Sequence, residues 1–256
     1  SLLMRAAYAA EDAGEIERAL ALMNAALDEL DPEKDARERI EALLVKARTN
    51  ALVTGGGVEP LQEALQLLPE DADAAFRARV LEMLARRTML SGNPQRGIEL
   101  SQQAVDAAAQ ADSDSITANA WITLGTSLAA AGREEEGLAA FERVSHLARS
   151  SARTLLRFYI NYSDALNHVG RYEDAASQAL SGVEMASELG LQRSLGAMLA
   201  GNAAEPLLAL GQWARASAMI ERALELDPPA HHHAHLRLLQ AWLFVWRGQL
   251  DEADAV

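Results

Sequence analysis

Residues 119–148 read NAWITLGTSLAAAGREEEGLAAFERVSHLA, and this stretch holds the pattern that decides the fold. Four of its apolar or small residues have the i, i+3, i+4, i+7 spacing that places side chains on one face of an α-helix; they are Trp121, Leu124, Gly125 and Leu128. Gly132 then predicts the end of this helix, because a residue without Cβ adopts the left-handed conformation at low cost.

The second half of the stretch predicts a second helix. Arg133 is followed by three glutamates, whose charge suits the positive N-terminal end of a helix. Gly137, Phe141 and Val144 form its apolar face, and Gly137 is small enough to let the two helices approach closely. Residues 119–148 are therefore expected to form a pair of packed helices.

The same signature, a glycine followed five positions later by a small residue, recurs along the chain. It occurs at Gly14–Ala19, Gly92–Gly97, Gly132–Gly137, Gly170–Ala175, Gly211–Ala216 and Gly248–Ala253. The glycines are 78, 40, 38, 41 and 37 residues apart, and the first interval spans two periods, with a degenerate copy near Gly57–Ala64. A fixed period averaging 39 residues is typical of a stacked solenoid.

These copies resemble the tetratricopeptide repeat, whose pattern is Trp-x2-Leu-Gly-x2-Tyr followed by Ala-x3-Phe. The chain has Trp121-x2-Leu124-Gly125-x2-Leu128 and then Gly137-x3-Phe141, and the next copy has Tyr159-x2-Tyr162-Ser163-x2-Leu166. The resemblance covers nearly the whole chain and implies an all-α fold, a right-handed α-α superhelix of about seven helix pairs. The period exceeds the family's usual ~34 residues. One copy departs further, where Gly55-Gly56-Gly57 precedes a second helix expected from about Pro60 to Leu68.

We expect residues 1–256 to form a single helical-repeat domain, because the repeats run on without a linker. The predicted repeats lie near 1–34, 35–70, 71–112, 113–151, 152–190, 191–229 and, incomplete, 230–256. Both ends lack the polar capping units of complete solenoids. A fragment of a longer protein is therefore the expectation.

The composition of the chain argues against nucleic-acid binding and against a membrane-spanning segment. The formal net charge of −14 lacks the basic footprint of nucleic-acid binding, so direct contact with DNA or RNA is not expected. The chain has no cysteine, no apolar run of membrane-spanning length and no signal-peptide layout. A cytoplasmic location without membrane contact is the expectation.

Catalytic motifs are missing from the sequence. Neither Lys34 nor Lys46 belongs to a phosphate-binding loop. His146 and His168 are isolated, no nucleophile and base can be paired, and carboxylates such as Asp71 and Asp73 sit in predicted turns. The sequence predicts a non-enzymatic protein without a cofactor.

The segment His231-His232-His233 with His235 has two interpretations. On a helix His231 and His235 would share a face, as metal ligands do at i, i+4. The segment follows Asp227-Pro228-Pro229, however, and no acidic residue stands nearby at ligand spacing. A solvated turn and helix start is therefore the preferred interpretation, and the sequence leaves metal binding open.

A binding groove is the main candidate for function. The first helix of each pair lines the concave face of such solenoids, which serves as an extended binding surface. Mixed Arg, Asn and acidic side chains on these helices could bind a peptide carboxylate or a polar small molecule, and aromatic side chains could stack on a sugar or anchor a side chain; an ordinary wetted surface is the alternative. The candidates are Arg79, Glu82, Arg86, Asn119, Ile122, Thr126, Arg157, Asn161, Asp164, Asn167, Asn202, Glu205, Trp242 and Trp246.

A second resemblance concerns the setting of the repeats. The stretches GNAAEPLLALGQW at 201–213 and AWLFVWRGQLDEA at 241–253 look like the helical sensor region of large ATP-binding transcriptional regulators of the LuxR type and of maltose-regulon activators. In that family an NTPase module precedes the repeats and a helix-turn-helix DNA-binding domain follows them. The resemblance implies a bacterial signal-transduction domain that binds an inducer or a partner protein. A plain scaffold that docks a partner's peptide is the alternative, and the oligomeric state is not predicted.

Overall fold

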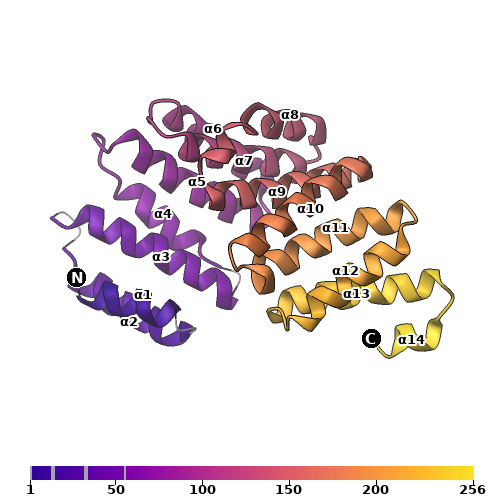
Figure 1. Ribbon diagram of the computed structural model, residues 1–256. Coiled ribbons are helices and arrows are strands. Elements are labelled where there is room, and N and C mark those ends of the chain that lie inside the picture. Colours follow the sequence, from indigo (N-terminus) through magenta and orange to yellow (C-terminus); the bar gives the residue numbers. More distant parts are fainter. Residues whose placement is uncertain (1, 13–14, 32–33, 55) are drawn as a thin grey trace. The chain divides into compact units, whose positions relative to one another are not determined.

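The computed structural model describes residues 2–12, 15–31, 34–54 and 56–256. These residues form fourteen α-helices joined by short turns, and none of the described residues lies in a strand (Figure 1). The all-α fold predicted from the sequence is confirmed. The chain divides into two compact units, Ser1–Gly132 and Arg133–Val256, which are described separately here as unit 1 and unit 2.

Unit 1 is a succession of helices in which each packs against the next, and the first helices of neighbouring pairs, α5 and α7, also touch. Its helices are α1 (Leu2–Asp12), α2 (Ile16–Glu29), α3 (Ala36–Thr54), α4 (Val58–Gln66), α5 (Ala74–Leu90), α6 (Pro94–Ala108) and α7 (Asp114–Ala130).

Unit 2 has the same organisation, with contacts between consecutive helices and between the first helices α9, α11 and α13. Its α-helices are α8 (Glu134–Val144), α9 (Ala152–His168), α10 (Tyr172–Glu188), α11 (Ala197–Ala209), α12 (Trp213–Glu225), α13 (Ala230–Trp246) and α14 (Leu250–Asp254). A 3-10 turn, η1 (Leu147–Ser150), precedes α9, and a π-helical turn, η2 (Gln192–Gly196), leads into α11.

Each sequence-predicted repeat range contains two α-helices. The packing of α7 against α8, which belong to different units, stays a prediction. The single-domain organisation stays a prediction. In the irregular second pair, α4 starts at Val58, two residues earlier than the expected Pro60, and ends at Gln66. Gly57 before it has φ 112°, and a Cβ there would lie 2.5 Å from the carbonyl oxygen of Ala47, so this loop packs directly against α3.

The recurring glycine has a conformational role. Gly92, Gly132, Gly170, Gly211 and Gly248 all have φ between 71° and 88°, and a Cβ on any of them would meet no atom within 4 Å. The left-handed backbone that ends each first helix is thus the reason for glycine, as predicted. Gly14 and Gly55 lie outside the described residues.

The small residue five positions later has a packing role. A Cβ on Gly97 would lie 2.9 Å from Cβ of Met89, and Ala175 and Ala216 are fully buried. Unit 2 adds an aromatic cluster, in which the buried Phe141 contacts the rings of Phe158 and Tyr162. No described helix combines the length and the apolar character needed to cross a bilayer.

Replacement of Gly170 tests the role of the left-handed turn. Gly170→Ala should lower the free energy of unfolding by about 1–2 kcal/mol, the cost of a left-handed residue with a Cβ. Gly170→Asn should cost less, because the short polar side chain of Asn tolerates this conformation. Urea unfolding followed by circular dichroism measures both variants, and equal stability of wild type and Gly170→Ala would contradict the assignment.

Candidate functional site

Three first helices of unit 2 are joined through one carboxylate. The Asn167 side chain on α9 donates from Nδ2 to Oε2 of Glu205 on α11, at 2.9 Å. The other oxygen, Oε1, lies 2.8 Å from Nε2 of His235 on α13. We call Asn167, Glu205 and His235 the Glu205 network. A polar side chain from each of three successive helix pairs therefore meets at one point.

Gly201 makes room for this arrangement. It lies on α11 one turn before Glu205, and a Cβ there would be 2.9 Å from Nδ1 of His235. The absence of a side chain lets the imidazole ring lie close to α11, where it reaches Glu205. Asn202 ties α11 to α9 as well, because its Nδ2 donates to the carbonyl oxygen of Ile160 at 3.0 Å and to Oγ of Ser163 at 3.3 Å.

The carboxylate of Asp164 has hydrogen-bonding capacity that the described residues do not use. Its side chain is 54% exposed, and its nearest ionic partner is Nδ1 of His168, 3.6 Å from Oδ1. No hydrogen bond from the described residues reaches the carboxylate. Desolvation by the surrounding helices, the largest effect, and the charge of Glu205 raise the pKa of Asp164, while His168 and His235 oppose the rise. Such a carboxylate suits a ligand that brings a cation or an N–H donor.

The histidine segment belongs to the first turns of α13, as the preferred sequence interpretation had it. The hydrogen bond to Glu205, and then the charges of Glu205 and Asp164, raise the pKa of His235. Desolvation, and repulsion by His231 and His235, lower the pKa of His232 to about 4. Among the described residues no group of three or more His, Cys, Asp or Glu side chains could hold a metal ion.

Other predicted groove residues of unit 2 make contacts of their own. Asn161 donates from Nδ2 to the carbonyl oxygen of Arg157 on its own helix, at 2.7 Å. Trp242 and Trp246 lie on the exposed side of α13, where Trp242 is 45% exposed, and their rings make no hydrogen bond to the network within the described part of the chain.

In unit 1 the predicted groove residues bond mostly to the protein itself. Arg79 pairs with Glu41 of α3 and lies over the Phe76 ring. Glu82 is only 8% exposed; its Oε1 accepts from Thr123 Oγ1 at 2.7 Å and lies 3.8 Å from Nε of Arg86. Asn119 and Thr126 donate to carbonyl oxygens of α7, those of Ser115 and Ile122.

The placement of Ile122 corrects one prediction. This side chain is fully buried. It is a core residue, because it lies on the face of α7 that packs against the neighbouring helices, whereas Trp121 keeps a half-buried position.

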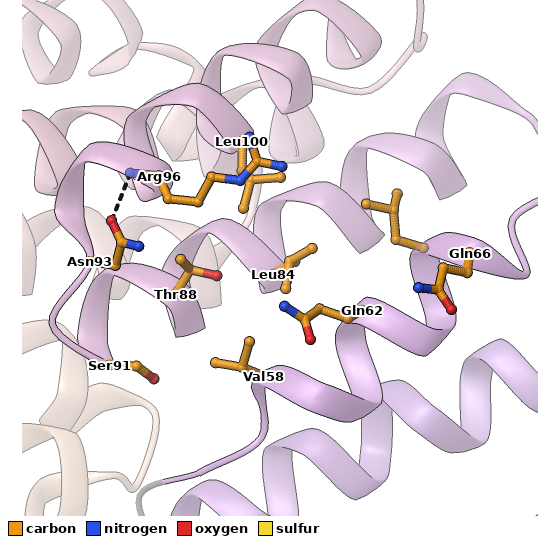
Figure 2. Close-up of a pocket in the computed structure, with 10 residues that line it drawn as sticks. Val58, Gln62, Gln66, Leu84, Thr88, Ser91, Asn93, Arg96 and Leu100 are labelled. Atoms are coloured by element: carbon orange, nitrogen blue, oxygen red, sulfur yellow. Dashed lines mark hydrogen bonds between the residues drawn. The ribbon is translucent and has the colours of Figure 1, made fainter.

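A pocket that the sequence did not predict lies in unit 1 (Figure 2). It is open to solvent, has a volume of about 560 Å³ and lies between the second helices α4 and α6, with the first helix α5 as its floor. We call it the α4–α6 pocket. Gln62 and Gln66 stand one turn apart on α4, and their i, i+4 spacing was the one available sequence signal. Its lining residues are Val58, Gln62, Leu65, Gln66, Leu84, Thr88, Ser91, Asn93, Arg96 and Leu100.

Comparison with known proteins identifies the fold. No family model and no curated protein matches the chain. Solved structures do: a tetratricopeptide repeat protein from Parabacteroides merdae has a TM-score of 0.63 at 16% identity, covering 98% of this chain and 88% of its own. A Rap protein complexed with competence and sporulation factor gives 0.66 at 14% identity, covering 98% and 75%.

A third structure places such repeats in a larger protein. It is a signal transduction ATPase with numerous domains and a tetratricopeptide repeat sensor, from Pyrococcus horikoshii. Its TM-score is 0.64 at 12% identity, and the match covers 99% of this chain and 41% of that protein. At these identities the similarity shows the fold alone. The chain therefore has the tetratricopeptide-type helical repeat fold that its sequence pattern predicted.

The hydrogen bond between His235 and Glu205 predicts a pH dependence of stability. The pKa of His235 in the folded state lies above its value of about 6.5 in the unfolded chain. Protonation of His235 therefore adds to the free energy of unfolding, fully below pH 6.5, and this contribution is lost as the pH rises through the raised pKa. Because His235 is about one-third exposed, the contribution should stay below about 1 kcal/mol.

Thermal unfolding between pH 6.5 and 8.5 measures this contribution. His235→Gln should flatten the decline in melting temperature, whereas His233→Gln, in the same turn but without a contact to Glu205, should leave it as in the wild type. The pKa of His168 is also raised, first by its hydrogen bond to the Asp164 carbonyl, so a residual slope in His235→Gln is expected. A slope unchanged by His235→Gln would contradict the assignment.

Proposed function

We propose that the chain is a non-catalytic binding domain whose ligand contacts the first helices of unit 2 at Asp164 and the Glu205 network. The observation that carries this proposal is the single carboxylate of Glu205, which connects α9, α11 and α13. A ligand at this point touches three repeats at once.

The chemistry of the site favours a ligand with N–H donors. Asp164 offers a partly desolvated carboxylate, and Glu205 adds a second negative charge close to it. A protonated amine or a run of peptide N–H groups would satisfy the oxygens of Asp164 and relieve the repulsion between the two carboxylates. The ligand that fits best is a protein segment or small-molecule inducer with a cationic or amide group.

A ligand at this site could also act as a switch. Binding changes a conformational equilibrium only if the ligand has different affinities for two states. Contacts that depend on the relative positions of α9, α11 and α13 supply such a difference, because a small shift between repeats separates Asn167 and His235 from Glu205. The alternative, a scaffold that docks a partner without switching, requires one arrangement of these helices with and without ligand.

We place this binding domain in a cytoplasmic bacterial regulator of the LuxR type. Two observations support the proposal. The first is the resemblance of residues 201–213 and 241–253 to that family. The second is the fold shared with a Rap protein complexed with competence and sporulation factor and with a signal transduction ATPase that has a tetratricopeptide repeat sensor. In this setting ATP hydrolysis and DNA binding belong to other modules of the regulator.

The variant Asp164→Asn should weaken ligand binding without lowering the stability of the fold. The raised pKa means that the ionised carboxylate does not stabilise the folded state at neutral pH. The variant should therefore keep or slightly raise the melting temperature, by on the order of 1–2 °C, since the group is half exposed. Its affinity for a partner or inducer co-purified with the wild-type chain should fall about tenfold or more, the loss of a charge-assisted hydrogen bond.

The matched control for this experiment is Asp174→Asn. Asp174 on α10 pairs with Arg171 at 2.8 Å on the exposed surface. This variant should bind as the wild type does and should not gain stability. Isothermal titration calorimetry measures the affinities, and an Asp164→Asn protein with wild-type affinity would remove this site from the proposal.

The genome of the source organism tests the regulator setting. We expect the reading frame to encode a Gly-x4-Gly-Lys-Ser/Thr phosphate-binding loop before this segment and a helix-turn-helix domain after it. Sequencing of the locus is the measurement. A reading frame without either module would leave the scaffold alternative as the function of the chain.

A further inference from the structure

The helix α13 of unit 2 is apolar on two opposite faces (Figure 1). Its inner face lies in the core of the unit, where three leucines are fully buried: Leu236, Leu239 and Leu243. Its outer face holds one small and four large apolar side chains, and the large ones are 45–49% exposed; we define it as Ala234, Leu238, Trp242, Val245 and Trp246. A helix that is apolar all round is expected to be buried on both faces. The outer face of α13 therefore calls for a partner.

The register of the repeats shows what kind of contact this face is suited to. The last two glycines of the repeat signature are 37 residues apart, which makes Leu238 equivalent to Gly201 of α11. In the same way, Trp242 is equivalent to Glu205. Gly201 and Glu205 are the positions at which α11 receives α13, since both lie against the ring of His235. The outer face of α13 thus continues an existing series of contacts between helices, and a helix is the partner that fits it.

The charge of the chain limits where two copies can meet. The formal net charge is −14, so two copies repel each other over most of their surfaces. Among the fourteen α-helices of the described residues, α13 is the one that contains neither Asp nor Glu. Because salt screens charges beyond about 8 Å at physiological ionic strength, carboxylates at the contact itself oppose association most. The outer face of α13 is free of them.

The outer face is also complementary to itself. Ala234, Leu238, Trp242 and Trp246 follow one another at intervals of four residues and form one ridge of the helix. Two copies of this ridge can meet antiparallel about a two-fold axis between Leu238 and Trp242. Each Leu238 then lies beside Trp242 of the second copy. Each Ala234 lies beside Trp246, so the smallest side chain of the ridge faces a large one. A parallel pair would instead set the two Trp246 rings against each other and leave a gap at Ala234.

The size of the surface indicates weak association. Because an aromatic side chain buries about 150–250 Å², two half-exposed tryptophans contribute roughly 200 Å². Leu238, Val245 and the exposed Leu250 of α14 extend the patch to on the order of 400–500 Å² on one copy, which is large for a monomer. Twice this area lies at the low end of specific interfaces. A dissociation constant on the order of 10 µM is therefore expected.

From these observations we propose that the outer face of α13 is a homodimer interface, in which the α13 helices of two copies pack antiparallel across a two-fold axis. Such an interface is isologous, since the same patch serves both copies. It does not involve Asp164 of α9, so it is independent of the ligand site proposed above.

Sedimentation velocity of the whole chain tests the interface, from about 1 µM to about 200 µM, on either side of the expected dissociation constant. The sedimentation coefficient should rise from that of a monomer to that of a dimer. Trp242→Glu places a carboxylate at the centre of each copy's patch, so the variant should dimerise at least about tenfold more weakly.

The matched control is Leu189→Glu. Leu189 follows α10 and is 44% exposed, so this variant adds the same charge at an equally exposed apolar position away from α13. It should dimerise as the wild type does, and so should Asp164→Asn. Circular dichroism verifies that each variant keeps the helical signal of the wild type.

Cross-linking tests the antiparallel arrangement without removing a large side chain. The chain has no cysteine, so Ala241→Cys and Ala234→Cys each provide a single thiol. Across the two-fold axis, the two copies of residue 241 are offset by about 3 Å along the helices, and those of residue 234 by about 18 Å. A short bis-maleimide should therefore link Ala241→Cys into covalent dimers and leave Ala234→Cys as monomers.

Three results would each overturn the proposal. A wild-type chain that stays monomeric over the whole concentration range leaves the outer face of α13 to a helix of a different protein or to a further helix pair of a longer chain. Equal association of the wild type and Trp242→Glu places the dimer contact elsewhere. Equal cross-linking of Ala234→Cys and Ala241→Cys rejects the antiparallel pairing. None of these results bears on ligand binding at Asp164, which the affinity of Asp164→Asn decides separately.

Discussion

The close approach of neighbouring helices is the constraint on which the rest of the structure depends. A pair of helices cannot bury its apolar surface alone, so each pair must pack against the next. Small residues at the contact points permit this. Gly182 shows how tight the contact is, because a Cβ there would lie 2.6 Å from a methyl group of Leu199. Some of the points of closest approach between helices are therefore occupied by small residues, such as Gly97 and Gly182, where a larger side chain would collide with the neighbouring helix.

The same constraint explains where function can reside. Residues that do not take part in packing are free to differ from repeat to repeat, and Glu205 and Asp164 are of this kind. Gly201 has a role in both packing and the site. Because it has no side chain, α13 can approach α11, and His235 has the space to reach Glu205. Packing thus determines the distance between the helices, and that distance determines whether one carboxylate can bond to both neighbours.

The period in the sequence predicted the helices and their turns because backbone conformation at Gly132 or Gly170 depends on local chemistry. It also placed Asn167 and Glu205 among the groove candidates. It missed the bond between Glu205 and His235, since these residues are 30 positions apart and their contact depends on the rotation of α11 against α13. Ile122 was wrongly predicted to line the groove. One position along a helix rotates the direction of a side chain by about 100° about the helix axis, so a small error in the assumed face moves a residue from the groove to the core.

The α4–α6 pocket could not be predicted because it is produced by an irregularity of the repeat. α4 spans nine residues, whereas α6 spans fifteen. A short second helix covers less of the following first helix, so Leu84 and Thr88 line a cavity. The glycine-rich turn at Gly57 holds the start of α4 against α3 and fixes this geometry. The regular repeat provides the helices that line the pocket. The departure from the repeat at α4 is what opens the pocket, so irregular repeats indicate where a ligand can bind.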